Sequence, residues 1–272
     1  MAIATGDQYI GSAKQLVPYA KTTSIATVAQ QSFGLLDVAG NPSAGSLAIG
    51  NTTAGVVPTD LTAGFPIINA FGVAGGTKGY ISRIAFSSSV ACRFKLWDRL
   101  WHAGSVSMTA LATTTFTGQP SYVGRLPASD YKNLFIILEI NTAVSATATT
   151  IAVGYTNQDG TTGRTTGATG SLSAFTNKRC IIMPLQAGDS GVQKIDSVTV
   201  GGIVATAGTF NVIVARLLAT GLRVNVVGQG DVLGLDRTGM VEVFETSALW
   251  LTVETDSTAS GVPDLELEIA NA

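Results

Sequence analysis

Strict alternation of apolar and polar positions is the main pattern along the chain. Near the C-terminus Leu265, Leu267 and Ile269 alternate with polar or small residues, which predicts a strand with one apolar face. Residues 195–200 show a less strict alternation, with Ile195, Ser197 and Thr199 on one face and Asp196, Val198 and Val200 on the other. Glycine turns separate such runs at the spacing of an antiparallel sheet, and no window of about 12 residues predicts a capped amphipathic helix. The pattern therefore predicts a mostly β protein.

Beyond residue 60 the sequence repeats itself. Five segments recur in the same order at offsets of 114 to 117 residues. The paired segments are 66–68 with 180–183, 81–86 with 195–200, 94–100 with 210–217, 134–139 with 249–254, and 151–157 with 265–271. Ordered matches with so little drift are typical of an internal duplication. We therefore predict two similar tandem domains, residues 61–172 and 173–272, each an antiparallel β-sandwich or jelly roll.

Residues 1–60 differ from the rest of the chain. They are rich in Ala, Gly, Ser and Thr, and they contain Pro18, Pro42 and Pro58. They hold few large apolar side chains to offset a backbone ordering cost of about 1–2 kcal/mol per residue. We therefore predict an extended N-terminal arm, which orders against a neighbouring subunit or the shell rather than on its own domains.

Composition favours a protein that works in an assembly. Hydrophobic residues make up 46% of the chain, aromatic residues 7% and charged residues 12%. The charged fraction is about half of the roughly 25% of an average soluble domain. A surface covered by Ser, Thr, Asn and Gly suits subunit packing, although a thermostable monomer has a similar composition.

Charge and hydropathy argue against two classes of partner. The formal charge is −2 and the 16 Lys and Arg residues are scattered singly, so no basic surface for nucleic acid is expected. The longest apolar runs, such as 134–138, are far shorter than the roughly 20 residues that cross a membrane, and residues 1–7 lack a signal-peptide pattern. Cys92 and Cys180 are too few for a disulfide framework and are expected as buried thiols. We expect a soluble chain without nucleic-acid or membrane partners.

Catalytic chemistry finds little support in the sequence. His102 is the only histidine, which excludes a pair of histidine metal ligands and leaves a single candidate imidazole base. Asp98, Glu139 and Glu254 lie in or beside predicted strands, and their spacing identifies no acid and base pair. Residues 72–79 contain Gly-Thr-Lys before a strand, which predicts a turn rather than a phosphate loop. We expect no enzyme activity, no cofactor and no metal.

An aromatic cluster is the most distinctive local feature. It consists of Phe94, Trp97 and Trp101, and we expect one tryptophan in the core and the other at a subunit contact, with core packing alone as the alternative. Tyr155 and Arg164 join the two tryptophans as predicted interface residues.

Arg99 and Arg216 occupy equivalent places in the two copies of the repeat. Their equivalence predicts a shared structural role, in which each guanidinium binds a carboxylate or a loop carbonyl.

Three segments carry a resemblance to a known class of proteins. They are Leu-Trp-Asp-Arg-Leu-Trp-His at 96–102, Ala-Thr-Ala-Thr-Thr at 146–150, and Tyr-Thr-Asn-Gln-Asp-Gly-Thr-Thr-Gly-Arg-Thr at 155–165. The stretch 80–166 resembles capsid decoration (cement) proteins encoded among the head genes of tailed bacteriophages. The resemblance implies a virion protein, made in the host bacterial cytoplasm, that binds the outside of the capsid and stabilises it by bridging shell subunits. It implies the major capsid protein as partner and a homo-oligomer, commonly a trimer.

Two other functions stay open at the level of the sequence. A tail or head-fibre component would bind a host-surface carbohydrate by stacking exposed Trp and Tyr side chains on sugars. A glycan hydrolase is the third candidate, and it lacks a credible acid and base pair.

Overall fold

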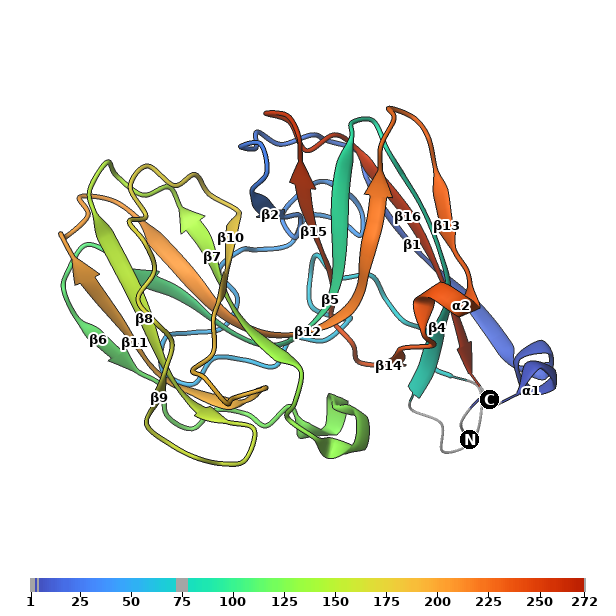
Figure 1. The fold of residues 1–272 in the computed structure, drawn as a ribbon, viewed down its shortest axis with the longest axis horizontal. Helices are drawn as coiled ribbons and strands as arrows, with labels where there is room; N and C mark the ends of the chain where they lie inside the picture. Colours follow the sequence, from blue (N-terminus) through green and yellow to red (C-terminus); the bar gives the residue numbers. More distant parts are fainter. Residues whose placement is uncertain (1–2, 4, 72–77, 272) are drawn as a thin grey trace.

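The computed structural model describes residues 3, 5–71 and 78–271, so most of the turn predicted at 72–79 lies outside the described residues. The chain is mostly β (Figure 1), as the alternation predicts. The strands are β1 Ala13–Lys21, β2 Ser32–Gly34, β3 Gly40–Asn41, β4 Lys78–Ser88, β5 Cys92–Ser107, β6 Thr113–Thr115, β7 Leu134–Thr142, β8 Thr149–Asn157, β9 Arg164–Thr165, β10 Arg179–Met183, β11 Val192–Gly202, β12 Thr209–Val224, β13 Asp231–Leu233, β14 Glu242–Phe244, β15 Leu249–Thr255 and β16 Pro263–Asn271. The short helices are α1 Gly6–Gly11, α2 Leu235–Thr238, and the 3-10 turns Val123–Arg125 and Pro127–Ser129.

The strands form two units that lie side by side in Figure 1. The outer layer of the right-hand unit is a sheet of β13-β4-β16-β1-β3 with β14 beside β4, and that of the left-hand unit is a sheet of β6-β11-β8-β9. The remaining strands of both units belong to one closed barrel, in the order β10-β2-β15-β5-β12-β7. β5 and β12 run through both units as an antiparallel pair, which we name the central ribbon. The region where the ribbon passes between the units is the waist.

Each unit has its own hydrophobic core, and the central ribbon contributes to both. In the right-hand unit Phe94 and Leu222 of the ribbon pack with the apolar faces of β1, β4 and β16. In the left-hand unit Val106 and Phe210 of the ribbon pack under β8 and β11. A third cluster fills the waist and consists of Leu36, Leu47, Phe65, Trp97, Ile137, Cys180, Ile213, Ala215, Ala248 and Trp250.

Strands of the two predicted copies follow the same order but are interleaved in space. β4, β5, β7 and β8 correspond to β11, β12, β15 and β16, and the first and last strands of the two sets begin 114 residues apart. Pairing is reciprocal, because β4 pairs with β16 where β11 pairs with β8, and β5 pairs with β15 where β12 pairs with β7. Each unit therefore holds strands from both 61–172 and 173–272, and two separate tandem sandwiches are not confirmed.

The extended arm predicted for residues 1–60 is not confirmed either. β1 pairs with β16 along eight consecutive residues, and Val17, Tyr19 and Phe33 lie in the right-hand core. Alternate apolar residues of β1 face that core, so this stretch obtains burial and ladder hydrogen bonds within its own chain. The partner strand lies at the other end of the sequence, where a local reading does not find it.

Lys21 anchors the end of β1. Its Nζ donates to the carbonyl oxygens of Val38 and Pro42, each at 2.9 Å. The side chain is 1% exposed, and burial lowers its pKa to about 8. The amine thus holds residues 38–42, which include β3, against the first strand.

Candidate functional site

Three of the four predicted interface residues lie in the interior. Trp97 is 2% exposed, and Trp101 and Tyr155 are 0% exposed. The Trp97 indole donates to Thr252 Oγ1 at 3.0 Å, and the Trp101 indole donates to the carbonyl of Ala54 at 3.1 Å. Because these side chains are satisfied within the chain, their expected interface role is corrected to a role in the core.

Arg164, the fourth predicted interface residue, belongs to a polar cluster around Asp189. Its Nε and Nη2 donate to the two carboxylate oxygens, each at 2.9 Å. The Tyr155 hydroxyl donates to Asp189 Oδ2 at 2.7 Å, and Asn157 Nδ2 donates to Oδ1 at 2.8 Å. The Arg164 hydrogen bonds hold the pKa of Asp189 well below its ordinary value. The cluster joins β8 and β9 to the loop before β11, and an interface role for Arg164 stays a prediction.

Asp189 is expected to make the protein less stable in acid. The pKa of Asp189 is lower in the folded chain than in the unfolded one. Its contribution to the free energy of unfolding is therefore fully present above the ordinary pKa of an aspartate and is lost as the pH falls through the folded pKa. Between about pH 4 and pH 2 we expect the free energy of unfolding of the wild type to fall more steeply than that of Asp189→Asn. Urea denaturation at successive pH values measures both slopes. The exposed Asp159→Asn is the control, and equal slopes for wild type and Asp189→Asn would contradict the assignment.

A buried polar cluster lies at the waist. Arg99 and Glu139 are both 0% exposed, and Arg99 Nη2 lies 3.2 Å from Glu139 Oε1. Arg99 Nη1 lies 2.9 Å from His102 Nδ1, and Asn211 Nδ2 donates to Glu139 Oε2 at 3.4 Å. The Trp250 ring covers the guanidinium at 3.9 Å. The cluster links β5, β7, β12 and β15 where the two units meet.

A second buried ionic group is centred on Asp98. This carboxylate accepts hydrogen bonds from Arg125 and from the backbone N–H of Ala248, the latter at 3.0 Å. Arg216 Nη2 lies 3.8 Å from Asp98 Oδ2 and donates to the carbonyl of Glu242 at 2.7 Å. The group ties β5 and β12 to the segment between β14 and β15.

The shared role predicted for Arg99 and Arg216 is confirmed. Arg99 binds the carboxylate of Glu139, and Arg216 lies 3.8 Å from the carboxylate of Asp98 and also donates to the carbonyl of Glu242 in β14. Both arginines stand on the central ribbon, so each strand of the ribbon supplies one guanidinium to the waist.

The surroundings of His102 limit its chemistry. Burial lowers its pKa well below the ordinary value, and the positive charge of Arg99 lowers it further. Since Nδ1 faces a guanidinium donor, it accepts, and the proton of the neutral ring lies on Nε2. The side chain is 0% exposed, which favours a structural role over one that requires contact with a substrate.

Among the described residues, no group of three or more His, Cys, Asp or Glu side chains is placed to hold a metal ion. No helix in the described part of the chain is long and apolar enough to cross a membrane.

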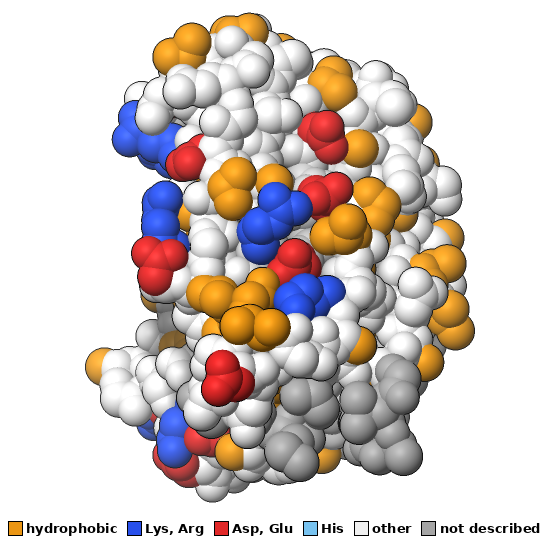
Figure 2. Space-filling view, turned by 90° about the vertical axis from the view of Figure 1, so that its right-hand side faces the viewer, with side chains coloured by type: hydrophobic (Ala, Val, Ile, Leu, Met, Phe, Trp, Pro, Cys, Tyr) orange, Lys and Arg blue, Asp and Glu red, His pale blue; other side chains and the backbone are white. Residues whose placement is uncertain are grey.

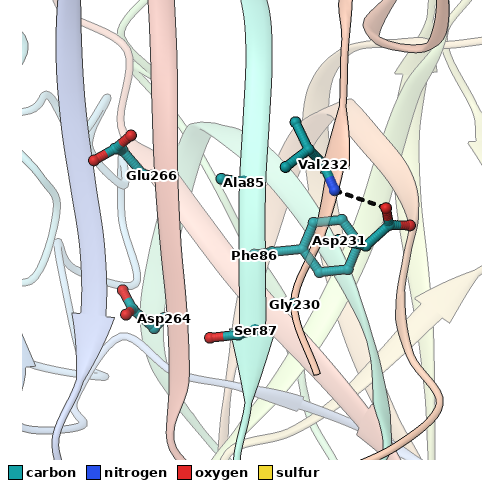
Figure 3. Close-up of a pocket in the computed structure, with 8 residues that line it drawn as sticks. All are labelled: Ala85, Phe86, Ser87, Gly230, Asp231, Val232, Asp264 and Glu266. Atoms are coloured by element: carbon teal, nitrogen blue, oxygen red, sulfur yellow. Dashed lines mark hydrogen bonds between the residues drawn. The ribbon is translucent and has the colours of Figure 1, made fainter. Parts of the chain in front are cut away.

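The outer face of the six-stranded sheet carries a shallow acidic hollow (Figure 3). Its volume is about 530 Å³, with Ala85 between Glu266 and Asp264 of β16 on one side and Asp231 of β13 on the other. Glu266 is already paired with Arg83 at 2.6 Å. Figure 2 shows apolar and charged side chains of both signs mixed over this face. Such a mixed, open surface does not indicate a particular ligand.

Loops at the outer end of the left-hand unit form a surface without charge, which we name the Leu111 end. The loops are 108–112, 143–148 and 203–208. They contain no Asp, Glu, Lys or Arg, and backbone hydrogen bonds join them, from Ala205 to Met108 (3.2 Å) and from Ser145 to Ala207 (3.0 Å). The large apolar side chains exposed there are Leu111 (57%), Ile203 (60%) and Val204 (38%). The end is an ordered apolar surface.

Loops at the corresponding end of the right-hand unit form a similar surface, the Val227 end. The loops are 22–31, 89–91, 225–230 and 256–262. Asp256 is their one charged residue, and backbone hydrogen bonds run from Gly228 to Ser88 (3.1 Å) and from Ser89 to Val262 (3.4 Å). The large apolar side chains exposed there are Val28 (42%), Val226 (59%) and Val227 (67%). The uppermost part of Figure 2 shows apolar and uncharged side chains, with charged ones only below it.

The central ribbon joins the two ends. Leu111 follows β5 and Val227 follows β12, 116 residues later, within the offsets of the repeat. Each ribbon strand has 16 residues, so the ribbon spans about 50 Å along its length. Figure 1 shows the Leu111 end at the upper left and the Val227 end at the top of the right-hand unit. The chain thus presents two alike surfaces at the two ends of one continuous pair of strands.

Sequence reasoning did not identify these ends, although a signal for the Leu111 end exists. Residues 103–124 and 197–215 contain no charged residue. Each stretch by itself predicts only strands and loops without charge. The uncharged surface forms because the fold brings loops that are distant in the sequence together.

Comparisons with known proteins give little guidance. No protein-family model matches the chain, and no curated protein matches it. Among solved structures the chain is similar to the VP2 subviral particle of infectious bursal disease virus, at a TM-score of 0.20 and 10% identity, covering 100% of this chain and 83% of that one. The structure of the Gx strain of the same virus gives a TM-score of 0.19 and 9% identity over 95% of this chain and 80% of that one. TM-scores this low carry no argument about fold or function.

Proposed function

We propose that the chain is a virion structural protein that binds the outside of a bacteriophage capsid and bridges neighbouring subunits of the major capsid protein. The observation that carries this proposal is the pair of alike, nearly uncharged ends on one central ribbon. In this function the chain resides in the virion, assembles with further copies of itself, commonly as a trimer, and acts by binding rather than by catalysis.

The chemistry of the ends suits a protein partner. Exposed Leu, Ile and Val side chains gain roughly 1.5–3 kcal/mol each when they are fully buried, and loops without charge avoid the cost of desolvating ions. Fully buried centres of protein interfaces are likewise depleted in charged residues. An apolar patch on the shell is therefore a better partner for these ends than an ionic surface.

The duplication suits a partner that repeats. Two alike ends recognise two copies of one surface, and a shell of identical subunits presents such copies at regular spacing. Once one end is bound, the other binds at a high effective concentration, so two weak contacts give tight attachment. In this proposal the two copies of the sequence serve as two attachment points that share strands.

The carbohydrate-binding alternative loses its main support. It relied on exposed aromatic side chains to stack on sugars, whereas Trp97, Trp101 and Trp250 are at most 2% exposed.

Binding to undecorated shells tests the proposal. We expect Leu111→Asp and Val227→Asp each to lower the apparent affinity about ten-fold, and the double variant to bind more weakly still, because each removes one apolar contact. Occupancy after sedimentation measures binding at a series of protein concentrations. Leu61→Asp is the control, since Leu61 is 79% exposed but lies outside both ends. Wild-type affinity in both single variants, or failure of the wild-type chain to bind shells, would refute the proposal.

A further inference from the structure

A second surface, beside β10, combines apolar and basic character. It is a hollow of about 300 Å³ between β10 and the loop that precedes it. Its apolar lining consists of Leu172, Phe175, Ile181, Ile182, Met183 and Pro184. Leu172 and Met183 are 2% and 3% exposed and belong to the left-hand core, so the bottom of the hollow is firmly packed. We name this hollow the β10 groove.

Arg179 lies at the β10 groove without a counter-ion. Its guanidinium stacks on the Phe175 ring, 3.2 Å from the ring centre, and in the described residues it has no ion pair and no side-chain hydrogen bond. Partial burial lowers its pKa, and no neighbouring carboxylate raises it again. Among the described residues, seven of the nine arginines of the sequence form ion pairs, and Arg223, the other one without an ion pair there, is exposed. Arg179 is thus the partly desolvated guanidinium that still lacks an anion.

β10 also has an open side along the groove. It pairs with β7 through residues 180–183, but with β2 only through Arg179 and Cys180. Residues 181–183 therefore have a ladder partner on one side only, and Ile182 there is 41% exposed. An extended chain can add to such an edge through backbone hydrogen bonds, with side-chain pockets supplying specificity.

We propose that the β10 groove binds an extended segment of a partner protein that carries an Asp or Glu side chain flanked by apolar residues. The carboxylate forms a bidentate ion pair with Arg179, in which the planar guanidinium donates two parallel hydrogen bonds. A neighbouring apolar side chain enters the hollow over Leu172 and Met183, and the backbone adds beside residues 181–183. This site goes beyond the two ends, because its recognition depends on charge and theirs does not.

Charge complementarity selects this occupant over others. A purely apolar segment would leave the guanidinium buried without a counter-ion, which is costly. A free phosphate or a nucleic-acid backbone would satisfy the guanidinium but leave the apolar lining uncovered. A segment with both characters covers the whole groove.

Peptide titration of the full chain by amide NMR tests the site. The probe is the acetylated, amidated peptide Thr-Val-Asp-Val-Thr-Val, and the matched peptide has Asn in place of Asp. We expect the Asp peptide to shift the amide signals of residues 179–183 with a dissociation constant on the order of 1 mM or below, and the Asn peptide to bind about ten-fold more weakly. In Arg179→Gln the Asp peptide should bind as weakly as the Asn peptide does to the wild type.

Two controls keep the test decisive. Arg223→Gln removes the exposed, unpaired arginine outside the groove and should leave binding unchanged. Arg179→Lys retains the charge without the planar guanidinium and should bind the Asp peptide with intermediate affinity. This variant tests the site even if Arg179→Gln disturbs the fold. Equal affinity for the two peptides, shifts away from 179–183, or no shift at several times the expected dissociation constant would overturn the proposal.

Discussion

Replacing Glu139 with alanine is expected to lower the free energy of unfolding by about 3–5 kcal/mol. The change leaves the Arg99 guanidinium, which is 0% exposed, without its carboxylate partner at 3.2 Å. Asn211 Nδ2 loses an acceptor at the same time. A buried charge without a partner is costly, because water does not reach it.

Glu254 provides a matched control for Glu139. It stands at the equivalent position of the repeat, 115 residues later, and pairs with Arg93 at 3.4 Å and Lys95 at 3.8 Å. Because its partners are half-exposed, Glu254→Ala should cost only about 0–1 kcal/mol. Urea denaturation at pH 7 followed by circular dichroism measures both variants. A loss for Glu139→Ala no larger than that for Glu254→Ala would show that the buried pair contributes little.

The Trp250→Ala variant should lose a similar amount, about 3–5 kcal/mol. Trp250 is 0% exposed in the waist cluster and covers Arg99 at 3.9 Å, so its removal leaves a large cavity and uncovers the guanidinium. Trp250→Phe keeps a ring in place and should cost clearly less. Denaturation followed by circular dichroism gives both values.

Since both cores adjoin the waist, hydrogen exchange should rise in both units of the Trp250→Ala variant. Loss of protection in one unit alone would contradict this linkage.

The sequence predicts the strands well because their pattern is local. The alternation at 265–270 lies within β16, and residues 195–200 lie within β11. A period of two assigns side chains to faces, but it does not say which strand lies beside which. A register shift between Ile195 and Ser197 also places Val198, rather than Ser197, on the buried face with Ile195.

Long-range pairing is the part that the sequence does not predict. The repeat predicts two alike sets of strands, yet nothing local requires that β4 pair with β16 rather than with strands of its own copy. For the same reason residues 13–20 of β1 do not indicate their partner at the C-terminus.

For the candidate sites too, the sequence predicts local features but not contacts between distant segments. Equivalence in the repeat correctly predicts a binding role for Arg99 and Arg216, but it does not identify their partners, Glu139 of β7 and Glu242 of β14, which lie on strands distant in the sequence. Spacing does not decide the burial of Trp97 and Trp101. β15 pairs with β5 only through residues 92–98, and Trp101, which lies beyond that ladder, is covered by Ala54 and Phe116 from distant parts of the chain. Arg179 gives no local signal either, because its lack of a counter-ion is a property of the folded surroundings.

The continuous central ribbon has a mechanical consequence. A two-unit chain joined by a flexible linker adapts to many separations between its partners, whereas two paired strands that pass through both cores allow little change in separation. In the proposed function, such a chain would bind with both ends only where two sites on the shell lie at the matching distance. Expansion or curvature of the shell lattice would then decide where it attaches.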